Sequence, residues 1–274
     1  MPLSIIIVNF NTKDLTIRCV CSIIQSKPKV KYEIIIIDNA STDDSWGALK
    51  KLSKKYKNIR IFGNKTNLGF AKANNLGISK ARGKYILLLN SDTLVKEKAI
   101  DALYQFASKK VDAGVVGGQL INPDGSIQAS VFRFPTIFRA FRQYWLGEKG
   151  VLDKFFPKTQ EPCEVEAVVG AVFLITPSAL KEVGKLDERY FMYFEDLDYC
   201  RRVAKAGLKV YYLPSAKIIH YHGASGKNIV SSTNQWRRLI PSSKIYHGVI
   251  RHYLINFFIW SGQKLCKLFR VEKS

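Results

Sequence analysis

This sequence of 274 residues lacks long apolar runs, glycine-rich phosphate loops and paired cysteines. No run reaches the roughly 18 to 20 apolar residues that cross a bilayer, so no transmembrane helix is expected. The apolar run at 3–8 is too short for a signal peptide and has no basic start. No G-x-G-x-x-G follows this run, and no G-x-x-x-x-G-K with Ser or Thr after it occurs. A dinucleotide oxidoreductase and a P-loop enzyme are therefore disfavoured.

Acidic residues and cysteines are also scarce. The chain has 43 Lys and Arg against 22 Asp and Glu, which gives a net charge of +21. Such a balance indicates an anionic partner: nucleic acid, a phosphorylated substrate or a negatively charged membrane surface. The five cysteines form no CxxC pair. An odd number without zinc spacing is typical of reduced thiols in a cytosolic compartment.

What the chain does contain is an alternation of short apolar runs with helical segments. The strongest strand signals lie at 3–8, 32–37 and 85–89. The alternation predicts an α/β fold with a mostly parallel, Rossmann-like central sheet covered by helices on both faces. Open sheets of this kind bind ligands at the carboxyl ends of their strands, which here carry Asp38 and Asp92.

The pattern loosens after residue 100. The segment 133–166 is aromatic and basic, and it is predicted to be irregular. The remaining predicted elements are strands at 113–121, 168–175, 209–213 and 217–221 and a short helix at 178–183.

The last 49 residues, 226–274, differ from the rest, with nine Lys or Arg and one Glu. A helical period at 249–270 places apolar side chains on one side and mostly polar or basic ones on the other. With Trp260 included, this profile predicts a helix lying in a membrane interface. The alternative, an amphipathic helix packed on the rest of the chain, stays open. We therefore divide the chain into residues 1–225 and a basic amphipathic helical extension, 226–274.

Residues 191–202 combine aromatic and acidic side chains. Glu195, Asp196 and Asp198 lie beside four aromatics and are followed by two arginines. An apolar approach to a carboxylate lowers the local dielectric, as a general base requires. The alternative is a helix start, because acids favour the first turn and arginines a later one.

Polar side chains that follow the strands are candidate ligands. Asp38 could accept a hydrogen bond from a ring N–H, such as N3 of uracil or thymine, or it could cap a turn. Asp92 could bind a hard divalent cation that it shares with substrate phosphates, although a strand-end Asp is also a common helix cap. His220 and His222 would face the same side of a strand, and one of them could complete a metal site.

Taken in order, these residues resemble the motifs of family 2 inverting glycosyltransferases, which have the GT-A fold. The motifs that carry the resemblance are Val8-Asn-Phe-Asn-Thr12, Asp38-Asn-Ala-Ser-Thr-Asp43, Asn67-Leu-Gly-Phe70, Leu89-Asn-Ser-Asp92, Gly170-Ala171 and Phe194-Glu-Asp-Leu-Asp198. Asn122-Pro-Asp-Gly125, followed by Ser130, Arg133 and Phe134-Pro135, is similar to the rhamnosyltransferase-like branch. The resemblance covers roughly residues 3–226.

The resemblance implies a role for each matching position. Asp196 would be the catalytic base, with Glu195 as its acidic neighbour. Asp92 and His220 would hold Mn²⁺ or Mg²⁺ at the diphosphate, with His222 as the runner-up to His220. The residues implied in binding the nucleotide-sugar are Asn9, Asn11, Asp38, Asn67, Gly69, Asn74, Asn90, Ser91 and Arg133.

Two of these positions have particular consequences. Asp38 would bind the base of the nucleotide. Asn90 departs from the acid that the family has at the first position of its metal motif, which leaves one fewer anionic ligand.

The resemblance also implies a reaction and a setting. A sugar, L-rhamnose from dTDP-rhamnose, would pass in one in-line displacement to a hydroxyl of a saccharide or lipid-linked acceptor in cell-surface polysaccharide synthesis. One base suffices, because the nucleoside diphosphate leaves without protonation. We expect a cytoplasmic protein, peripherally attached to the inner face of the cell membrane through its C-terminus. A homo-oligomer is left open.

Three other functions fit parts of the sequence. A transferase of the same family that uses a UDP-sugar differs only in its donor. A nucleic-acid-binding protein would fit the net charge, but no recognition-helix motif is present and nine of the cations lie in the aromatic tail. A nucleotidyltransferase would need a glycine- and lysine-rich phosphate loop near the N-terminus, which the residues Val8-Asn-Phe-Asn do not supply.

Overall fold

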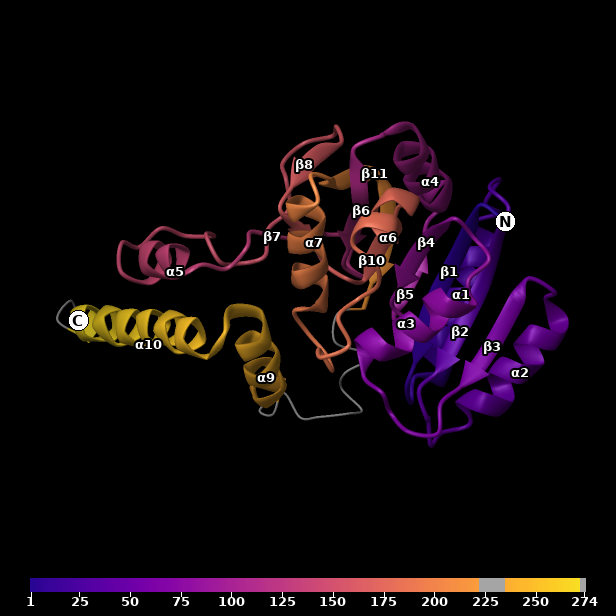
Figure 1. The fold of residues 1–274 in the computed structure, drawn as a ribbon, viewed down its shortest axis with the longest axis horizontal. Coiled ribbons are helices and arrows are strands. Elements are labelled where there is room, and N and C mark those ends of the chain that lie inside the picture. The colour runs from indigo at the N-terminus through magenta and orange to yellow at the C-terminus, as the bar shows by residue number, and fades with distance from the viewer. Residues whose placement is uncertain (222–234, 272–274) are drawn as a thin grey trace.

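The computed structural model describes residues 1–221 and 235–271. Its strands are β1 (Leu3–Asn9), β2 (Tyr32–Asp38), β3 (Ile59–Gly63), β4 (Tyr85–Leu89), β5 (Thr93–Val95), β6 (Ala113–Ile121), β7 (Val131–Phe132), β8 (Cys163–Val165), β9 (Ala167–Val168), β10 (Val172–Ile175) and β11 (Lys209–His220). Its helices are α1 (Lys13–Gln25), α2 (Ser45–Lys55), α3 (Phe70–Lys80), α4 (Ala99–Lys109), α5 (Ile137–Tyr144), α6 (Pro177–Glu182), α7 (Glu195–Lys205), α9 (Gln235–His247) and α10 (Val249–Val271). Figure 1 shows their arrangement.

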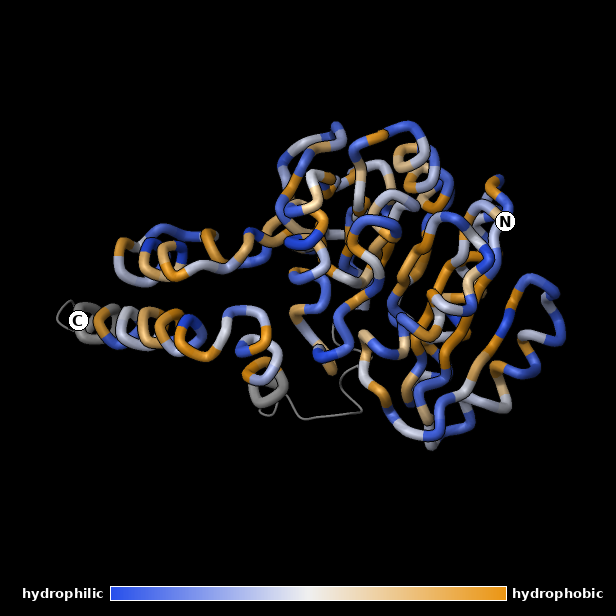
Figure 2. The backbone as a smooth tube through the Cα atoms, viewed as in Figure 1, coloured by the Kyte–Doolittle hydropathy of each residue, from blue (hydrophilic) through white to orange (hydrophobic). Residues whose placement is uncertain are grey.

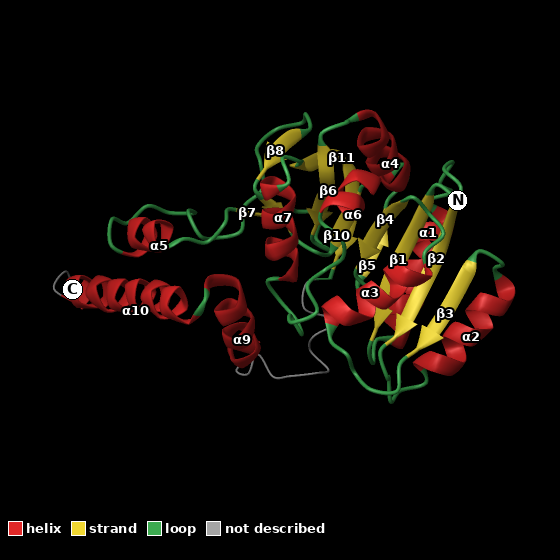
Figure 3. Ribbon diagram, in the orientation of Figure 1, coloured by secondary structure: helices red, strands yellow, loops and turns green. Residues whose placement is uncertain are grey.

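The first half of the central sheet is parallel. β3, β2, β1 and β4 lie in that order and run in one direction, with Asn9 paired to Asp38 at the ends of β1 and β2. The apolar runs of β1, β2 and β4 are buried because helices cover both faces of the sheet (Figure 3). The carboxyl ends of these strands therefore meet at one edge, which we call the carboxyl edge.

The second half of the sheet is mixed. β10 runs antiparallel between β4 and β6, whereas β11 is parallel to β6 and antiparallel to β5. The predicted fold class, a mostly parallel sheet flanked by helices, is confirmed. The two strands predicted at 209–213 and 217–221 form one strand, β11, whose register to β6 shifts between Leu213 and Lys217.

The predicted strand at 168–175 is instead divided into β9 and β10. Residues 169–171 lie between them and leave Gly170 free to turn toward α7, where its backbone N–H donates to Asp196. Through residues 170 and 171, the interruption connects the start of α7 to the loop after β4 at the carboxyl edge.

The C-terminal part contains the predicted helix, α10, preceded by the unpredicted helix α9. α10 packs along α5, a helix inside the segment that the sequence predicts to be irregular. The two run side by side away from the sheet, with hydrophobic residues along both (Figures 1 and 2). No described helix is both long and apolar enough to cross a membrane. The proposed boundary at 225/226 falls outside the described residues.

Candidate active site

Two side chains at the carboxyl edge hold each other in place. The Asn9 amide Nδ2 donates to Asp38 Oδ1 at 2.7 Å, and the Ser41 hydroxyl donates to the same oxygen at 2.6 Å. Asn9 is buried, and its Oδ1 accepts from the hydroxyls of Thr12 and Thr16. Asp38 is therefore fixed at the edge as an acceptor, in the position predicted for contact with a base.

The loop before α3 is tied to the same edge. Asn67 Oδ1 accepts from the Asn39 side-chain amide at 2.8 Å and from the Gly69 N–H at 2.9 Å. Gly69 has φ +81°, and a Cβ there would lie 2.4 Å from the carbonyl oxygen of Phe191. The Phe70 N–H donates to that same carbonyl at 2.6 Å. A glycine is needed here because the loop touches the segment that leads into α7.

Three predicted binding residues have structural contacts of their own. Asn11 Oδ1 accepts from the Thr42 N–H at 2.7 Å, and Asn74 donates within α3 to the Phe70 carbonyl. Arg133 donates to the Gly150 carbonyl at 2.8 Å, with its guanidinium over the ring of Phe155. Arg133 also lines a cavity of about 470 Å³ that no other described site residue lines. Arg133 thus lies in the β7–β8 region, and its contact with the donor stays a prediction.

The loop after β4 connects the edge to β5. The Asn90 N–H donates to the Ala171 carbonyl at 3.0 Å, and its own carbonyl accepts from the Thr93 hydroxyl at 2.7 Å. Ser91 is buried, and its hydroxyl accepts from that of Thr12 at 3.3 Å. This loop holds residue 92 at the start of β5.

Asp92 and His220 meet because β5 pairs with the end of β11. The two side chains are almost fully buried, and His220 Nε2 lies 3.3 Å from Asp92 Oδ1. Asp92 and His220 are the two residues that the sequence predicts as metal ligands, and the structure brings their side chains together. His222 lies outside the described residues.

Gln128, which the sequence did not single out, orients the imidazole. Its Nε2 donates to Asn122 Oδ1 at 2.6 Å, so its Oε1 is left to face His220 Nδ1 at 2.6 Å. With Nδ1 donating to Gln128, the imidazole turns Nε2 toward Asp92. A hydrogen bond of this kind behind a histidine is what orients metal ligands in proteins.

These two side chains fit a shared divalent cation. Adjacent ligands of an octahedral ion with bonds of about 2.1 Å lie about 3 Å apart, close to the distance between Nε2 and Oδ1. No group of three or more His, Cys, Asp or Glu able to hold a metal occurs among the described residues. Phosphate oxygens and water are further ligands that such an ion commonly takes, as Mg²⁺ does.

The predicted base lies in the first turn of α7. Asp196 Oδ2 accepts from the Gly170 N–H at 3.0 Å, and its Oδ1 accepts from the Leu197 N–H at 2.8 Å. Gly170 adjoins Ala171, whose carbonyl accepts from the Asn90 N–H. The Asp196 carboxylate is therefore connected through one short segment to the loop after β4, which carries Asp92. Burial raises the pKa of Asp196, and hydrogen bonds from these backbone N–H groups oppose that rise.

Glu195 is in a different environment from its neighbour. It is buried, and its Oε2 meets no hydrogen-bond partner among the described residues. Burial first, and then the charge of Asp196, raise the pKa of Glu195 well above its usual range. These directions favour a proton on Glu195 and the negative charge on Asp196, which has two N–H donors.

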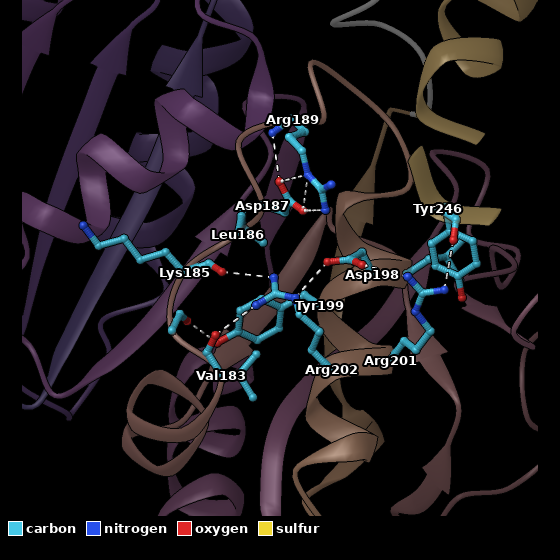
Figure 4. A network of polar contacts seen from close by, with 12 residues as sticks. Val183, Lys185, Leu186, Asp187, Arg189, Asp198, Tyr199, Arg201, Arg202 and Tyr246 are labelled. Carbon is cyan, nitrogen blue, oxygen red and sulfur yellow. Dashed lines mark hydrogen bonds and ion pairs between the residues drawn. The ribbon is translucent and has the colours of Figure 1, made fainter. Parts of the chain in front are cut away.

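The third acid of this stretch, Asp198, stabilises the fold locally. It is buried and accepts from Arg202 at 2.8 Å and from Arg201 at 3.1 Å. Arg202 also donates to the carbonyls of Val183 and Lys185, which ties α7 to the preceding loop (Figure 4). The helix-start interpretation of this stretch is thus right for Asp198, since an acid and arginines one turn apart pair along α7.

Two further features of the site were not predicted. Tyr193 and Phe194, just before α7, have φ of 70° and 68°, which is unusual for residues with side chains. Lys154 lies near enough to Asp196 that the positive charge of its ammonium lowers the pKa of that carboxyl. No sequence signal places Lys154 there, because the segment that carries it reaches α7 only through tertiary packing.

A mostly parallel sheet with acids at its carboxyl edge, and a helix-borne carboxylate beside them, is the arrangement that the resemblance to GT-A glycosyltransferases implies. The family model described as glycosyl transferase family 2 matches residues 4–175, more than half of the chain. The chain belongs to that family and is a glycosyltransferase.

Relatives with curated names support the same family. The chain is 32% identical over 215 residues to an N-acetylglucosaminyl-diphospho-decaprenol L-rhamnosyltransferase of Mycobacterium tuberculosis, covering 70% of this chain and 67% of the relative. It is 27% identical over 220 residues to the rhamnosyltransferase WbbL of Escherichia coli, covering 75% of this chain and 78% of the relative. These relatives place the chain in the rhamnosyltransferase-like branch.

Solved structures confirm the fold. A crystal structure of GalNAc-T7 with UDP, GalNAc and Mn²⁺ aligns with a TM-score of 0.64 and 20% identity, covering 80% of this chain and 44% of that one. A crystal structure of S. aureus TarS 1–349 aligns with a TM-score of 0.57 and 14% identity, covering 92% of this chain and 72% of that one.

Proposed function

We propose that this glycosyltransferase moves L-rhamnose from dTDP-rhamnose to a hydroxyl of a lipid-linked saccharide, with inversion at the anomeric carbon. The donor sugar is supported by two similar proteins named as rhamnosyltransferases. The acceptor class is supported by the Mycobacterium relative, whose name specifies a sugar on a diphospho-decaprenol.

The observation that carries the mechanism is the placement of Asp196. It is partly exposed, it is held by the N–H groups of Gly170 and Leu197, and it lies next to Glu195, whose pKa burial raises. Asp196 takes the proton from the acceptor hydroxyl as the hydroxyl oxygen bonds to the anomeric carbon. The bond from that carbon to the diphosphate breaks, and dTDP leaves with the electron pair.

The donor would lie along the carboxyl edge. Asp38 accepts a hydrogen bond from N3–H of the thymine, and the loop of Asn90 and Ser91 faces the diphosphate. Asp92 and His220 are the residues that would hold a divalent cation, which when bound offsets the charge of the diphosphate. GalNAc-T7, a protein of the same fold, was crystallised with Mn²⁺, so Mn²⁺ is the ion to test first and Mg²⁺ the second.

A UDP-sugar is the alternative donor. Asp38 would accept from N3–H of uracil as well as from that of thymine, because the two rings share this group. The 5-methyl group of thymine is the difference, and a pocket that packs against it would favour dTDP.

We place the reaction at the cytoplasmic face of the cell membrane, where a lipid-linked acceptor is accessible. The four described cysteines are free thiols, which supports a reducing compartment. We assign catalysis to residues 1–225 and attachment to 226–274, and we expect no nucleic acid as a partner.

Calorimetric titration of dTDP and UDP, with and without Mn²⁺, tests the proposal. The wild type should bind dTDP more tightly than UDP, and Mn²⁺ should strengthen both. Asp92→Ala should lose the effect of Mn²⁺ while keeping the weaker, metal-independent binding. Asp124→Ala, in an exposed turn away from the carboxyl edge, is the control and should behave as the wild type. Asn122→Ala in the same turn is unsuitable, because the Asn122 side chain accepts a hydrogen bond from Gln128. Absence of nucleotide binding to the wild type would overturn the proposal.

A further inference from the structure

α5 and α10 together form an arm that projects from the sheet (Figure 1). The rings of Phe141 and Trp145 pack against Phe258, and the Trp145 indole N–H donates to the Ser261 hydroxyl at 3.1 Å. Gly262 allows the close approach, because a Cβ there would lie 2.4 Å from the Tyr144 carbonyl oxygen. The arm is thus a packed unit whose two helices come from distant parts of the chain.

α10 is apolar on two faces, and only one of them is covered. Ile255 and Gly262 are buried toward α5. A second row, which we call the outer stripe, is exposed: Ile250 76%, Tyr253 57%, Leu254 42%, Phe257 53% and Trp260 56%. At the helical period these five side chains fall within an arc of about 120°. A monomer has no packing reason to keep such a stripe, so it marks a contact surface.

The charges around the outer stripe identify the partner. Lys244 lies 4.9 Å from the centre of the Tyr253 ring, and Lys264 lies 4.4 Å from that of Trp260. Lysines beside exposed aromatics are the pairing found where a helix meets lipid headgroups. Between residues 235 and 271 the sequence has seven Lys or Arg and no Asp or Glu.

The same charges disfavour the other occupant of such a surface, a second copy of this chain. Two outer stripes that face each other would bring both sets of cations together without an acid on either helix. An anionic lipid surface would neutralise these cations and cover the apolar row at the same time.

We propose that the arm lies in the plane of an anionic membrane, with the outer stripe at the boundary between headgroups and acyl chains. The inference deepens the proposed function and rests on it for its purpose, because a lipid-linked acceptor is held in that surface. An in-plane helix also agrees with the finding that no described helix can cross a bilayer.

Flotation of the full chain with vesicles tests the proposal. One vesicle is phosphatidylcholine alone, and the other is phosphatidylcholine with phosphatidylglycerol. The test variant carries Ile250→Ser, Phe257→Ser and Trp260→Ser. The matched control carries Asn256→Ser and Gln263→Ser, which are exposed on the same helix outside the stripe. Both sets leave the face toward α5 intact.

The wild type and the matched control should float with the anionic vesicles, and the stripe variant should bind at least about tenfold more weakly. Added salt should weaken the binding of the wild type. Equal binding by the stripe variant would overturn the proposal. Failure of the wild type to bind either vesicle would also overturn it. A dimer of the wild type, detected by light scattering and lost in the stripe variant, would overturn it in favour of a second copy of the chain.

Nucleotide titration of the same preparations separates this inference from the proposed function. The stripe variant should bind dTDP as the wild type does, since the stripe lies on the arm. Vesicle binding without nucleotide binding would preserve the arm inference and overturn the proposed function.

Discussion

At the scale of single residues, the site depends on an asymmetry between two adjacent acids. Glu195 is buried without a hydrogen-bond donor for its Oε2 among the described residues, whereas Asp196 has two backbone donors. Burial raises the pKa of both carboxyls, and the N–H groups of Gly170 and Leu197 oppose that rise at Asp196. These directions favour one proton, on Glu195, and one charge, on Asp196, as a general base at position 196 would require.

Replacing Asp196 by Asn should reduce turnover by about 10²- to 10⁴-fold, because the amide cannot take the acceptor's proton. Affinity for dTDP should stay close to that of the wild type. Glu195→Gln is the matched comparison, since a neutral amide replaces a neutral acid, and it should keep most of the turnover. Initial-rate kinetics with calorimetry measure both, and normal turnover in Asp196→Asn would rule out the base assignment.

The same pair makes stability depend on pH. Because the folded chain raises the pKa of Glu195, its stabilising contribution is fully present below the unfolded pKa, about 4.3, and is lost as the pH rises through the folded value. The midpoint temperature of thermal unfolding of the wild type should therefore fall as the pH rises above about 4.3. Glu195→Gln should show a flatter dependence, and identical slopes would contradict the protonated state of Glu195.

Gly69→Ala should disturb the loop before α7. The added Cβ would need to displace the Phe191 carbonyl, 2.4 Å away, and the backbone has a φ of +81° that alanine adopts at a cost of about 1 kcal/mol or more. We expect turnover to fall by about tenfold. Gly47→Ala is the matched control in α2, where nothing lies within 4 Å, and it should stabilise the chain by about 0.5–1 kcal/mol. Thermal unfolding and kinetics of both variants test this.

Strand-end acids could be predicted from the sequence because their position depends on local pattern alone. Asp38 and Asp92 follow apolar runs, and parallel strands bring such ends to one edge. Gln128 could not be predicted, since it reaches His220 only after β11 has formed beside β6. A polar residue whose partner lies 92 positions away leaves no local signal.

At the scale of elements, α9 supports the turn that precedes the base. The Ser242 hydroxyl donates to the Met192 carbonyl at 2.8 Å, and the ring of Tyr246 packs on Phe194. The Arg201 guanidinium lies 3.9 Å from the centre of the Tyr246 ring. Since Tyr193 and Phe194 have left-handed backbones, packing from outside is needed to hold them.

Tyr246→Ala should therefore affect catalysis as well as stability. Loss of a buried aromatic ring costs about 3–5 kcal/mol, and loosening of the turn should lower kcat by about tenfold. Affinity for dTDP should not change, because α9 packs on α7 and on the turn before it. Gln263→Ala, exposed on α10 outside the outer stripe, is the control and should leave kcat unchanged. An unaltered kcat in Tyr246→Ala would mean that α9 only stabilises the fold.

Elements with a clear period were predicted well, and those defined by tertiary contact were not. α10 was found from its apolar spacing, and its predicted bounds differ from the observed ones by one residue. α5 was missed because its eight residues are mostly aromatic or basic and gain their stability from α10. β11 was divided in two because Pro214 interrupts the pattern at the register shift.

At the scale of the whole molecule, the C-terminal helices are packed parts of the fold. α9 covers α7 and the turn before Asp196, and α10 covers one face of α5. The outer stripe stays exposed on the described part of α10. The sequence offered two alternatives for this region, an interfacial helix and a helix packed on the chain. The structure places α10 on α5, and contact of its other face with lipid remains the proposal.

A chain that lacks residues 235–274 should for this reason be less stable. The deletion would expose Phe141 on α5, further expose Trp145 after it, and uncover the face of α7 that Tyr246 covers. At about 1.5–3 kcal/mol for each large apolar side chain returned to water, the cost should reach several kcal/mol, a large part of the stability of a typical domain. The full chain with the outer stripe changed to serine is the control, because it keeps both faces covered. Thermal unfolding should separate the two, with a markedly lower midpoint for the shortened chain alone. If instead both variants unfold at the same temperature as the wild type, α9 and α10 do not stabilise the fold, and their contacts only position these two helices.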